Sequence, residues 1–284
     1  MKVYQGDSIE NVIRLLNGYE NPRLIAGGTD FILSFKDNGI PELLIDISNI
    51  EELRRIVEKE DYIEIGAGVT FTQIVESELF EGKLYGFKKA CRSVGSPQIR
   101  NRGTIGGNIV NCSAAADSIP PLICLDSTIV LKSSRGTREL KLEQYLQNYS
   151  EQKISNDELL TSIRFKKPIG TLNFAKLGLR KALAISRISI ATLIELEEER
   201  TIKSLKVSSG SIGRYPMREI EVENYLKGKR LTQNTLDEAI KGLQESMDKR
   251  LEGRSTLAYK RTAVERVLTE SLMEGMSALG EVVL

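Results

Sequence analysis

Gln98-Ile99-Arg100-Asn101-Arg102-Gly103-Thr104-Ile105-Gly106-Gly107-Asn108 is the stretch of this 284-residue sequence that decides its fold. It lies within a segment, Ile99 to Asp117, that is rich in Gly, Asn, Ser and Ala and follows no clear helical or strand period. Glycine lets a ligand come within contact distance of the backbone. We therefore expect a binding loop here, although an ordinary surface loop would have a similar composition.

A second glycine loop lies upstream, at Ala26-Gly27-Gly28-Thr29-Asp30, directly after a short predicted strand. Backbone N–H groups left free where a strand meets a helix favour an anion such as a pyrophosphate. Alone, this pentapeptide is more simply explained as a strand-to-helix turn. Two such loops suit two linked phosphates better than one loop does. Neither G-x-G-x-x-G nor G-x-x-x-x-G-K-[ST] occurs, which excludes a Rossmann fingerprint and a P-loop.

The charge balance argues against nucleic acid and membrane partners. Lys and Arg number 40 and Asp and Glu 39, so the net charge is only +1. No stretch approaches the roughly 20 apolar residues of a membrane span, and the first residues lack the apolar segment of a signal peptide. We expect a cytoplasmic protein.

Cysteine and histidine usage predicts a chain without a metal site. Cys91, Cys112 and Cys124 are widely spaced and form no C-x-x-C pair. Histidine is absent, which removes both imidazole ligands and an imidazole acid–base catalyst. We expect Cys112 to be a packing residue, and we identify no catalytic residue.

Periodicity and turn residues predict alternating helices and strands, with a linker at residues 166–170. Ser96-Pro97 is expected to break a helix, because the residue before proline avoids helical geometry. The predicted helices are 8–18, 29–38, 70–75, 84–94, 217–226, 236–247 and 257–272, and the predicted strands are 24–26, 43–47, 61–65, 129–132, 138–140, 188–197 and 202–209.

Several motifs in this order resemble one family, the FAD-binding subunits of molybdenum hydroxylases, which include xanthine, carbon monoxide and nicotinate dehydrogenases. They are the two glycine loops, Asp117 nine residues after Asn108, Leu160-Thr161-Ser162-Ile163, Phe174-Ala175-Lys176 and Ser255-Thr256-Leu257-Ala258-Tyr259-Lys260-Arg261. The resemblance implies an α+β fold with a two-subdomain FAD-binding domain of vanillyl-alcohol-oxidase type over residues 1–168, with subdomains of about 1–55 and 56–168. A C-terminal domain of antiparallel sheet and helices would follow over residues 171–284.

The same resemblance assigns roles to individual residues. Asp117 would accept a hydrogen bond from a sugar or ribityl hydroxyl, the backbone at Leu160 would meet the flavin or the adenine, and Lys176 would lie near the polar edge of the flavin. The plainer alternatives are a helix cap, a core residue and an exposed lysine. Ala184-Ile185-Ser186 would lie against the flavin, but an aromatic residue of some relatives is missing there. The pyrophosphate would be held by Ala26, Gly27, Gly28, Thr29, Asp30, Thr104, Gly106, Gly107 and Asn108.

The implied function is electron transfer. FAD would be the only cofactor of this chain, and molybdopterin and [2Fe–2S] clusters would lie on a large and a small partner subunit. Electrons would pass through FAD to NAD+ or another acceptor. We expect a xanthine dehydrogenase-like complex, with nicotinate or another N-heterocycle as the alternative substrate. A nucleotide-binding module without redox function and a stand-alone flavin oxidoreductase are the alternatives of other classes.

Overall fold

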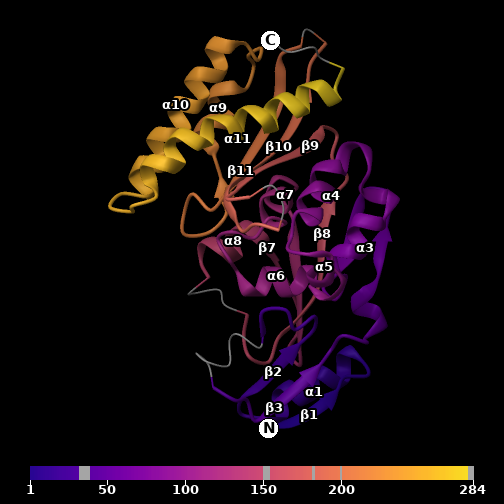
Figure 1. Cartoon of the computed structure of the whole chain (residues 1–284). Helices are drawn as coiled ribbons and strands as arrows, with labels where there is room; N and C mark the ends of the chain where they lie inside the picture. Colours follow the sequence, from indigo (N-terminus) through magenta and orange to yellow (C-terminus); the bar gives the residue numbers. More distant parts are fainter. Residues whose placement is uncertain (32–38, 150–153, 181–182, 199, 281–284) are drawn as a thin grey trace. The chain divides into compact units, whose positions relative to one another are not determined.

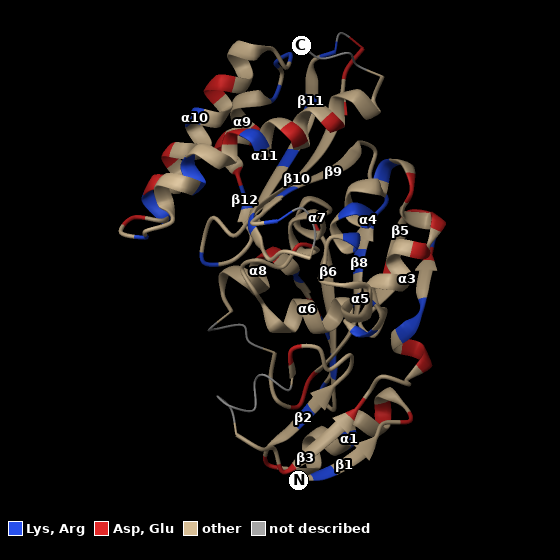
Figure 2. Cartoon of the chain, in the orientation of Figure 1, with Lys and Arg blue, Asp and Glu red and all other residues tan. Residues whose placement is uncertain are grey.

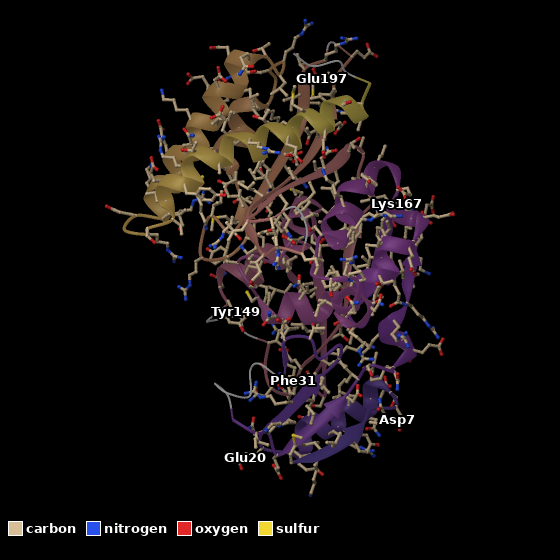
Figure 3. All side chains as sticks on the ribbon, viewed as in Figure 1. Asp7, Glu20, Phe31, Tyr149, Lys167 and Glu197 are labelled. Atoms are coloured by element: carbon tan, nitrogen blue, oxygen red, sulfur yellow. The ribbon has the colours of Figure 1, made fainter. Side chains whose placement is uncertain are left out.

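The computed structural model of the chain describes residues 1–31, 39–149, 154–180, 183–198 and 200–280. Most of the predicted helix 29–38 therefore lies outside the described residues. In Figure 3, Phe31 and Tyr149 are the last labelled residues before two of these gaps.

The chain forms two compact units that are not continuous in sequence. Unit 1 comprises Met1–Ile74, Ser96–Cys112 and Asp126–Lys167, and unit 2 comprises Val75–Gly95, Ser113–Leu125 and Pro168–Leu284. One break, after Lys167, falls within the predicted linker. Two segments of unit 2 nevertheless come from the first 168 residues.

A small parallel sheet in unit 1 leads into the first glycine loop. It is built from β1 (Lys2–Gln5), β3 (Leu43–Asp46) and β2 (Pro22–Ile25), in that order. Helix α1 (Ile9–Gly18) is capped by Ser8, as predicted. The Ser8 hydroxyl oxygen accepts the Asn11 N–H at 3.2 Å. The apolar face of α1 packs on this sheet in a shared cluster. The first glycine loop therefore begins at the end of β2, a strand of a sheet that α1 packs against.

The second sheet of unit 1 carries Leu160, one of the predicted site residues. Its five strands, in the order β4-β5-β8-β6-β7, are all antiparallel. They are β4 (Ile56–Glu58), β5 (Tyr62–Gly66), β6 (Thr128–Ser133), β7 (Gly136–Lys141) and β8 (Leu159–Lys166). The short helices that belong to unit 1 or begin in it are η1 (Glu51–Arg54), α3 (Phe71–Glu76), α5 (Pro97–Arg102), α6 (Ile105–Asn111) and α8 (Leu142–Gln147).

Unit 2 is built on a four-stranded antiparallel sheet, as predicted for the C-terminal domain. Its order is β12-β11-β10-β9, and α11 lies along β9 and β10 (Figure 1). The strands are β9 (Thr171–Gly178), β10 (Ser186–Leu196), β11 (Ile202–Gly210) and β12 (Met217–Arg218). The helices are η2 (Glu78–Phe80), η3 (Gly82–Leu84), α4 (Tyr85–Arg92), α7 (Ile119–Cys124), α9 (Ile220–Leu226), α10 (Gln233–Arg250) and α11 (Leu257–Ala278).

The long helices of unit 2 have one apolar and one charged side. Ile190, Ile194 and Val207 of the sheet share a core with buried residues of α10 and α11, such as Leu243 and Leu268. Charges of both signs are interspersed along the two helices (Figure 2), which agrees with the near-zero net charge.

Two sequence expectations were wrong. The segment 99–117 was expected to be irregular, but most of it is helical, because Ser96 caps α5 with Pro97 at its first position and Thr104 caps α6. The predicted helix 217–226 begins only at Ile220, because Met217 and Arg218 pair with Ser209 and Ser208 as β12. Pairing with the neighbouring strand β11 overrode the local helical preference at this point.

Gly86 offers a test of the packing between α4 and β9. A Cβ at Gly86 would lie 2.5 Å from the Leu172 carbonyl oxygen, whereas a Cβ at Gly242 in α10 would meet nothing within 4 Å. We expect Gly86→Ala to lower the free energy of unfolding by about 1–3 kcal/mol. Gly242→Ala should raise it by about 0.5–1 kcal/mol. Urea denaturation measures both, and equal effects of the two variants would contradict the close approach of α4 to the sheet.

Candidate functional site: two glycine loops and a buried carboxylate

The first glycine loop rests directly on the start of the second. A Cβ at Gly27 would lie 1.9 Å from the Arg102 carbonyl oxygen and 3.0 Å from the Gly103 nitrogen. No side chain fits there, so Gly27 allows the two backbones to touch. Gly28 has φ +74°, a conformation that L-residues rarely adopt. The structure thus brings together two loops that are more than 70 residues apart in sequence.

The first loop presents unpaired backbone donors. The N–H groups of Gly27, Gly28 and Thr29 find no hydrogen-bond acceptor in the described part of the chain. All three residues are half-buried, and Asp30 beside them is exposed. Adjacent free N–H groups form a concave site for an anion.

The second loop uses its donors differently. Ile105 N–H donates to Val69 O and Gly106 N–H to Ala67 O, both at 2.9 Å. Gly107 N–H donates to the Thr104 hydroxyl oxygen at 3.1 Å, and Asn108 N–H to Thr104 O at 3.0 Å. These N–H groups are already bound within the protein. The second loop therefore does not present a row of free amides to a ligand.

Gly106 and Gly107 are adjacent but serve different needs. A Cβ at Gly106 would lie 2.6 Å from both Cβ and O of Ala67. This glycine is therefore required because α6 packs directly against Ala67. A Cβ at Gly107 would meet only the Thr104 hydroxyl, at 3.0 Å, and the residue is exposed. The fold leaves the outer side of Gly107 open to a ligand.

Leu160 belongs to the core of β8 and is linked to the second loop through the backbone. It is 5% exposed. A bulge between β6 and β8 leaves Thr161 outside the regular pairing, and the Thr161 carbonyl accepts the Ala67 N–H at 2.9 Å. Ala67 in turn accepts the Gly106 N–H. A short chain of backbone bonds thus connects the Leu160 strand with the second loop.

Asp117 and Lys176 meet in unit 2. Lys176, on β9, donates to Asp117 Oδ2 and to the Ser93 carbonyl oxygen, the latter at 3.1 Å. The Ser93 hydroxyl also donates to Oδ2, at 3.0 Å, and the Ser186 hydroxyl donates to Oδ1. The side chains of Asp117 and Lys176 are only 6% and 15% exposed. Lys176 is therefore not an ordinary exposed lysine, and Asp117 does not cap α7, since the N-cap residue is Ser118.

The carboxylate has an unusual electrostatic setting. Burial raises the pKa of Asp117, and the Lys176 charge and the hydrogen bonds from Lys176, Ser186 and Ser93 offset this only in part. Cys91 is fully buried close by, and burial together with the Asp117 charge raises the pKa of its thiol well above the usual value. Cys112 is half-buried, and burial raises its pKa too. Neither environment favours a reactive thiolate.

Sequence reasoning missed Ser93 and the hydroxyl of Ser186. Each reaches Asp117 across a large sequence separation, 24 and 69 residues respectively. A serine at a helix end or at the start of a strand has no local signature, so only the three-dimensional contact identifies it. Ile185 next to Ser186 is 79% exposed, and its contact with a flavin stays a prediction.

Two further observations concern the described residues. They contain no group of three or more cysteine, aspartate or glutamate residues placed to hold a metal ion. No helix among them has both the length and the apolar character needed to cross a membrane.

The Asp117–Lys176 pair can be tested by removing the lysine. Lys176→Met leaves a buried carboxylate without its counter-charge, which typically costs about 3–5 kcal/mol. We expect that loss of unfolding free energy at neutral pH in urea denaturation. The variant raises the pKa of Asp117 further, so the loss should shrink as the pH falls towards the ordinary carboxyl pKa of 3.8. Lys176→Met combined with Asp117→Asn should recover most of the stability, and an equally unstable double variant would contradict the pairing.

Family descriptions match both parts of the chain. Residues 1–167 match the family described as the FAD binding domain in molybdopterin dehydrogenase. Residues 174–274 match the CO dehydrogenase flavoprotein C-terminal domain.

Curated proteins and solved structures agree with these matches. The nicotinate dehydrogenase FAD-subunit of Eubacterium barkeri is 33% identical, with 96% of this chain and 95% of that protein covered. The xanthine dehydrogenase FAD-binding subunit of Escherichia coli O157:H7 is 27% identical, with 98% and 96% covered. The reconstituted CO dehydrogenase from Oligotropha carboxidovorans has a chain that superposes with a TM-score of 0.89 at 25% identity, with 98% of each chain covered. This chain therefore belongs to the family of FAD-binding domains of molybdopterin dehydrogenases and is the FAD subunit of an oxidoreductase complex of that family.

Proposed function

We propose that the two glycine loops bind the pyrophosphate of FAD. The observation that carries this is a set of three N–H groups, at Gly27, Gly28 and Thr29, that have no acceptor among the described residues, in a loop that touches the second one at Arg102. Two linked phosphates need donors from more than one side, and the open face of Gly107 leaves room for close approach. The proposed cofactor-binding residues are Ala26, Gly27, Gly28, Thr29, Asp30, Thr104, Gly106, Gly107, Asn108, Asp117, Leu160 and Lys176.

Asp117 keeps capacity for one further hydrogen bond. A carboxylate has about four lone-pair sites, and three are used by Ser93, Lys176 and Ser186. The remaining site on Oδ1 suits a hydroxyl of the cofactor. Lys176 keeps the carboxylate ionised and supplies a positive charge beside it. These features support a binding and tuning role for the pair.

The proposed reaction is electron relay. FAD, when bound, supplies chemistry that links one-electron donors to two-electron acceptors. We propose a small partner subunit with [2Fe–2S] clusters as the donor, NAD+ as the acceptor, and hydroxylation of substrate on a large molybdopterin-binding subunit. In this arrangement the residues of this chain bind and orient the cofactor and act as neither acid nor base. The proposed domain boundary remains at residues 168–171.

An N-heterocycle is the proposed substrate of the complex. We propose xanthine, in line with the likeness to the Escherichia coli xanthine dehydrogenase subunit. Nicotinate is the second candidate, favoured by the higher identity, 33%, to the nicotinate dehydrogenase FAD-subunit. The two relatives differ too little in identity to this chain to decide the substrate. The substrate has to be determined on the large partner subunit, where we propose that it is hydroxylated.

The function can be tested on the chain and on its complex. The purified chain should bind FAD and take on visible flavin absorption. In the complex from the native host, that absorption should bleach when xanthine is added without an acceptor and return when NAD+ is added. Nicotinate in place of xanthine decides between the two candidates. A chain that stays colourless after incubation with FAD would be a nucleotide-binding module of another kind, contrary to the proposal.

Gly107→Ala tests the pyrophosphate position. The added methyl group enters the open side of Gly107, where we place the phosphates, so FAD affinity should fall at least about tenfold. The stability of the FAD-free chain should change little, because the helix preference of alanine is offset by its tight contact with the Thr104 hydroxyl, 3.0 Å from the new Cβ. Gly242→Ala is the control and should leave FAD affinity unchanged. A Gly107→Ala protein with normal FAD affinity, measured by quenching of flavin fluorescence, would place the phosphates elsewhere.

A further inference from the structure

The motif at the start of α11 is not used by the proposed cofactor site. Within it, the Lys260 ammonium donates to the backbone carbonyl oxygen of Ser211. No carboxylate forms an ion pair with Lys260 among the described residues. Arg187 and Arg254 lie close enough for their charges to act on it, and they add to the effect of burial in lowering the pKa of Lys260. One backbone carbonyl offsets only part of the cost of placing an ammonium in a half-buried position near two arginines.

Ser211 is held by all of its polar groups. Its φ is +65°, which is uncommon for a residue with a side chain and strains the backbone. Its N–H donates to Ala114 O at 2.7 Å and its hydroxyl donates to Ser186 O at 2.9 Å. Its carbonyl accepts from Lys260. A strained residue persists only when its surroundings fix it, and here three bonds do so.

The two residues to which Ser211 donates, Ala114 and Ser186, are each connected to Asp117. Ala114 lies three residues before Asp117 in the same short segment. Ser186 carries the hydroxyl that donates to Asp117 Oδ1. Lys260 is therefore joined to the carboxylate by an unbroken series of bonds through Ser211 and Ser186.

We propose that Lys260 is a positioning residue for the Asp117 carboxylate. By fixing Ser211, it holds the Ser186 backbone so that the Ser186 hydroxyl occupies one lone-pair site of Oδ1 and the other faces the cofactor. This rests on the proposed role of Asp117 in binding FAD. It adds a residue of the C-terminal domain, far along the sequence, to the determinants of cofactor affinity.

The test compares three lysine variants of the full chain. Lys260→Met should weaken FAD affinity about 3- to 10-fold, within the range of coupling through packed networks. Lys260→Arg keeps a cation that can donate to the Ser211 carbonyl and should restore most of the affinity. Lys241→Met, at an exposed position of α10, is the control and should have no effect. Flavin fluorescence gives the affinities, and the visible circular dichroism of bound flavin should change only in Lys260→Met.

A double-variant cycle shows whether Lys260 acts through Ser186. In a Ser186→Ala background the link to Asp117 is already cut, so adding Lys260→Met should cause no further loss of affinity. Additive losses would overturn the proposal, as would normal affinity and normal circular dichroism in Lys260→Met. Asp117→Asn separates the two levels of inference. If Asp117→Asn binds FAD normally, the proposed role of Asp117 is wrong and the role of Lys260 falls with it. If Asp117→Asn weakens binding and Lys260→Met does not, only the Lys260 proposal is wrong.

Discussion

Contact between backbones, which is possible only where a side chain is missing, is the constraint on which this structure depends. In unit 1, Gly27 lets the first loop touch the carbonyl of Arg102, and Gly106 lets α6 sit against Ala67. In unit 2, Gly86 brings α4 similarly close to β9, where a Cβ would lie 2.5 Å from the Leu172 carbonyl oxygen. A methyl group at any of these three positions would overlap a neighbouring atom. These glycines thus allow the close approach of the neighbouring backbone segments in the protein itself.

In the proposed pyrophosphate site the two loops differ in how they use their backbone donors. Among the described residues, the N–H groups of Gly27, Gly28 and Thr29 find no acceptor, whereas the N–H groups in the first turn of the second loop donate to carbonyl and hydroxyl acceptors of the protein. The first loop would therefore supply the free backbone donors, and the second loop is held in place by its own hydrogen bonds.

Asp117 is a buried, ion-paired carboxylate of unit 2. It is a buried carboxylate with three donors, and it would be too costly to ionise without them. Its donors come from α4's C-terminal end, β9 and β10, so its geometry depends on the whole sheet. Lys176 supplies its counter-charge, and Lys260 donates to Ser211, whose N–H donates to Ala114 in the segment that carries Asp117. An acceptor held this firmly can bind a hydroxyl at a defined position with little loss of entropy.

The sequence by itself determined the local features and the family. Ser8 as a cap, the helix break before Pro97 and the two glycine loops are readable from residue types and spacing, because each depends on neighbours within a few positions. The antiparallel C-terminal sheet follows from the family resemblance. Tertiary structure alone decided what depends on distant contacts. It turned Met217 and Arg218 from helix into strand, bound the donors of the second loop, distinguished Gly106 from Gly107, and brought Ser93, Ser186 and Lys176 around Asp117. The physical reason is that hydrogen bonding and desolvation act over a few ångströms in space, whatever the separation along the chain.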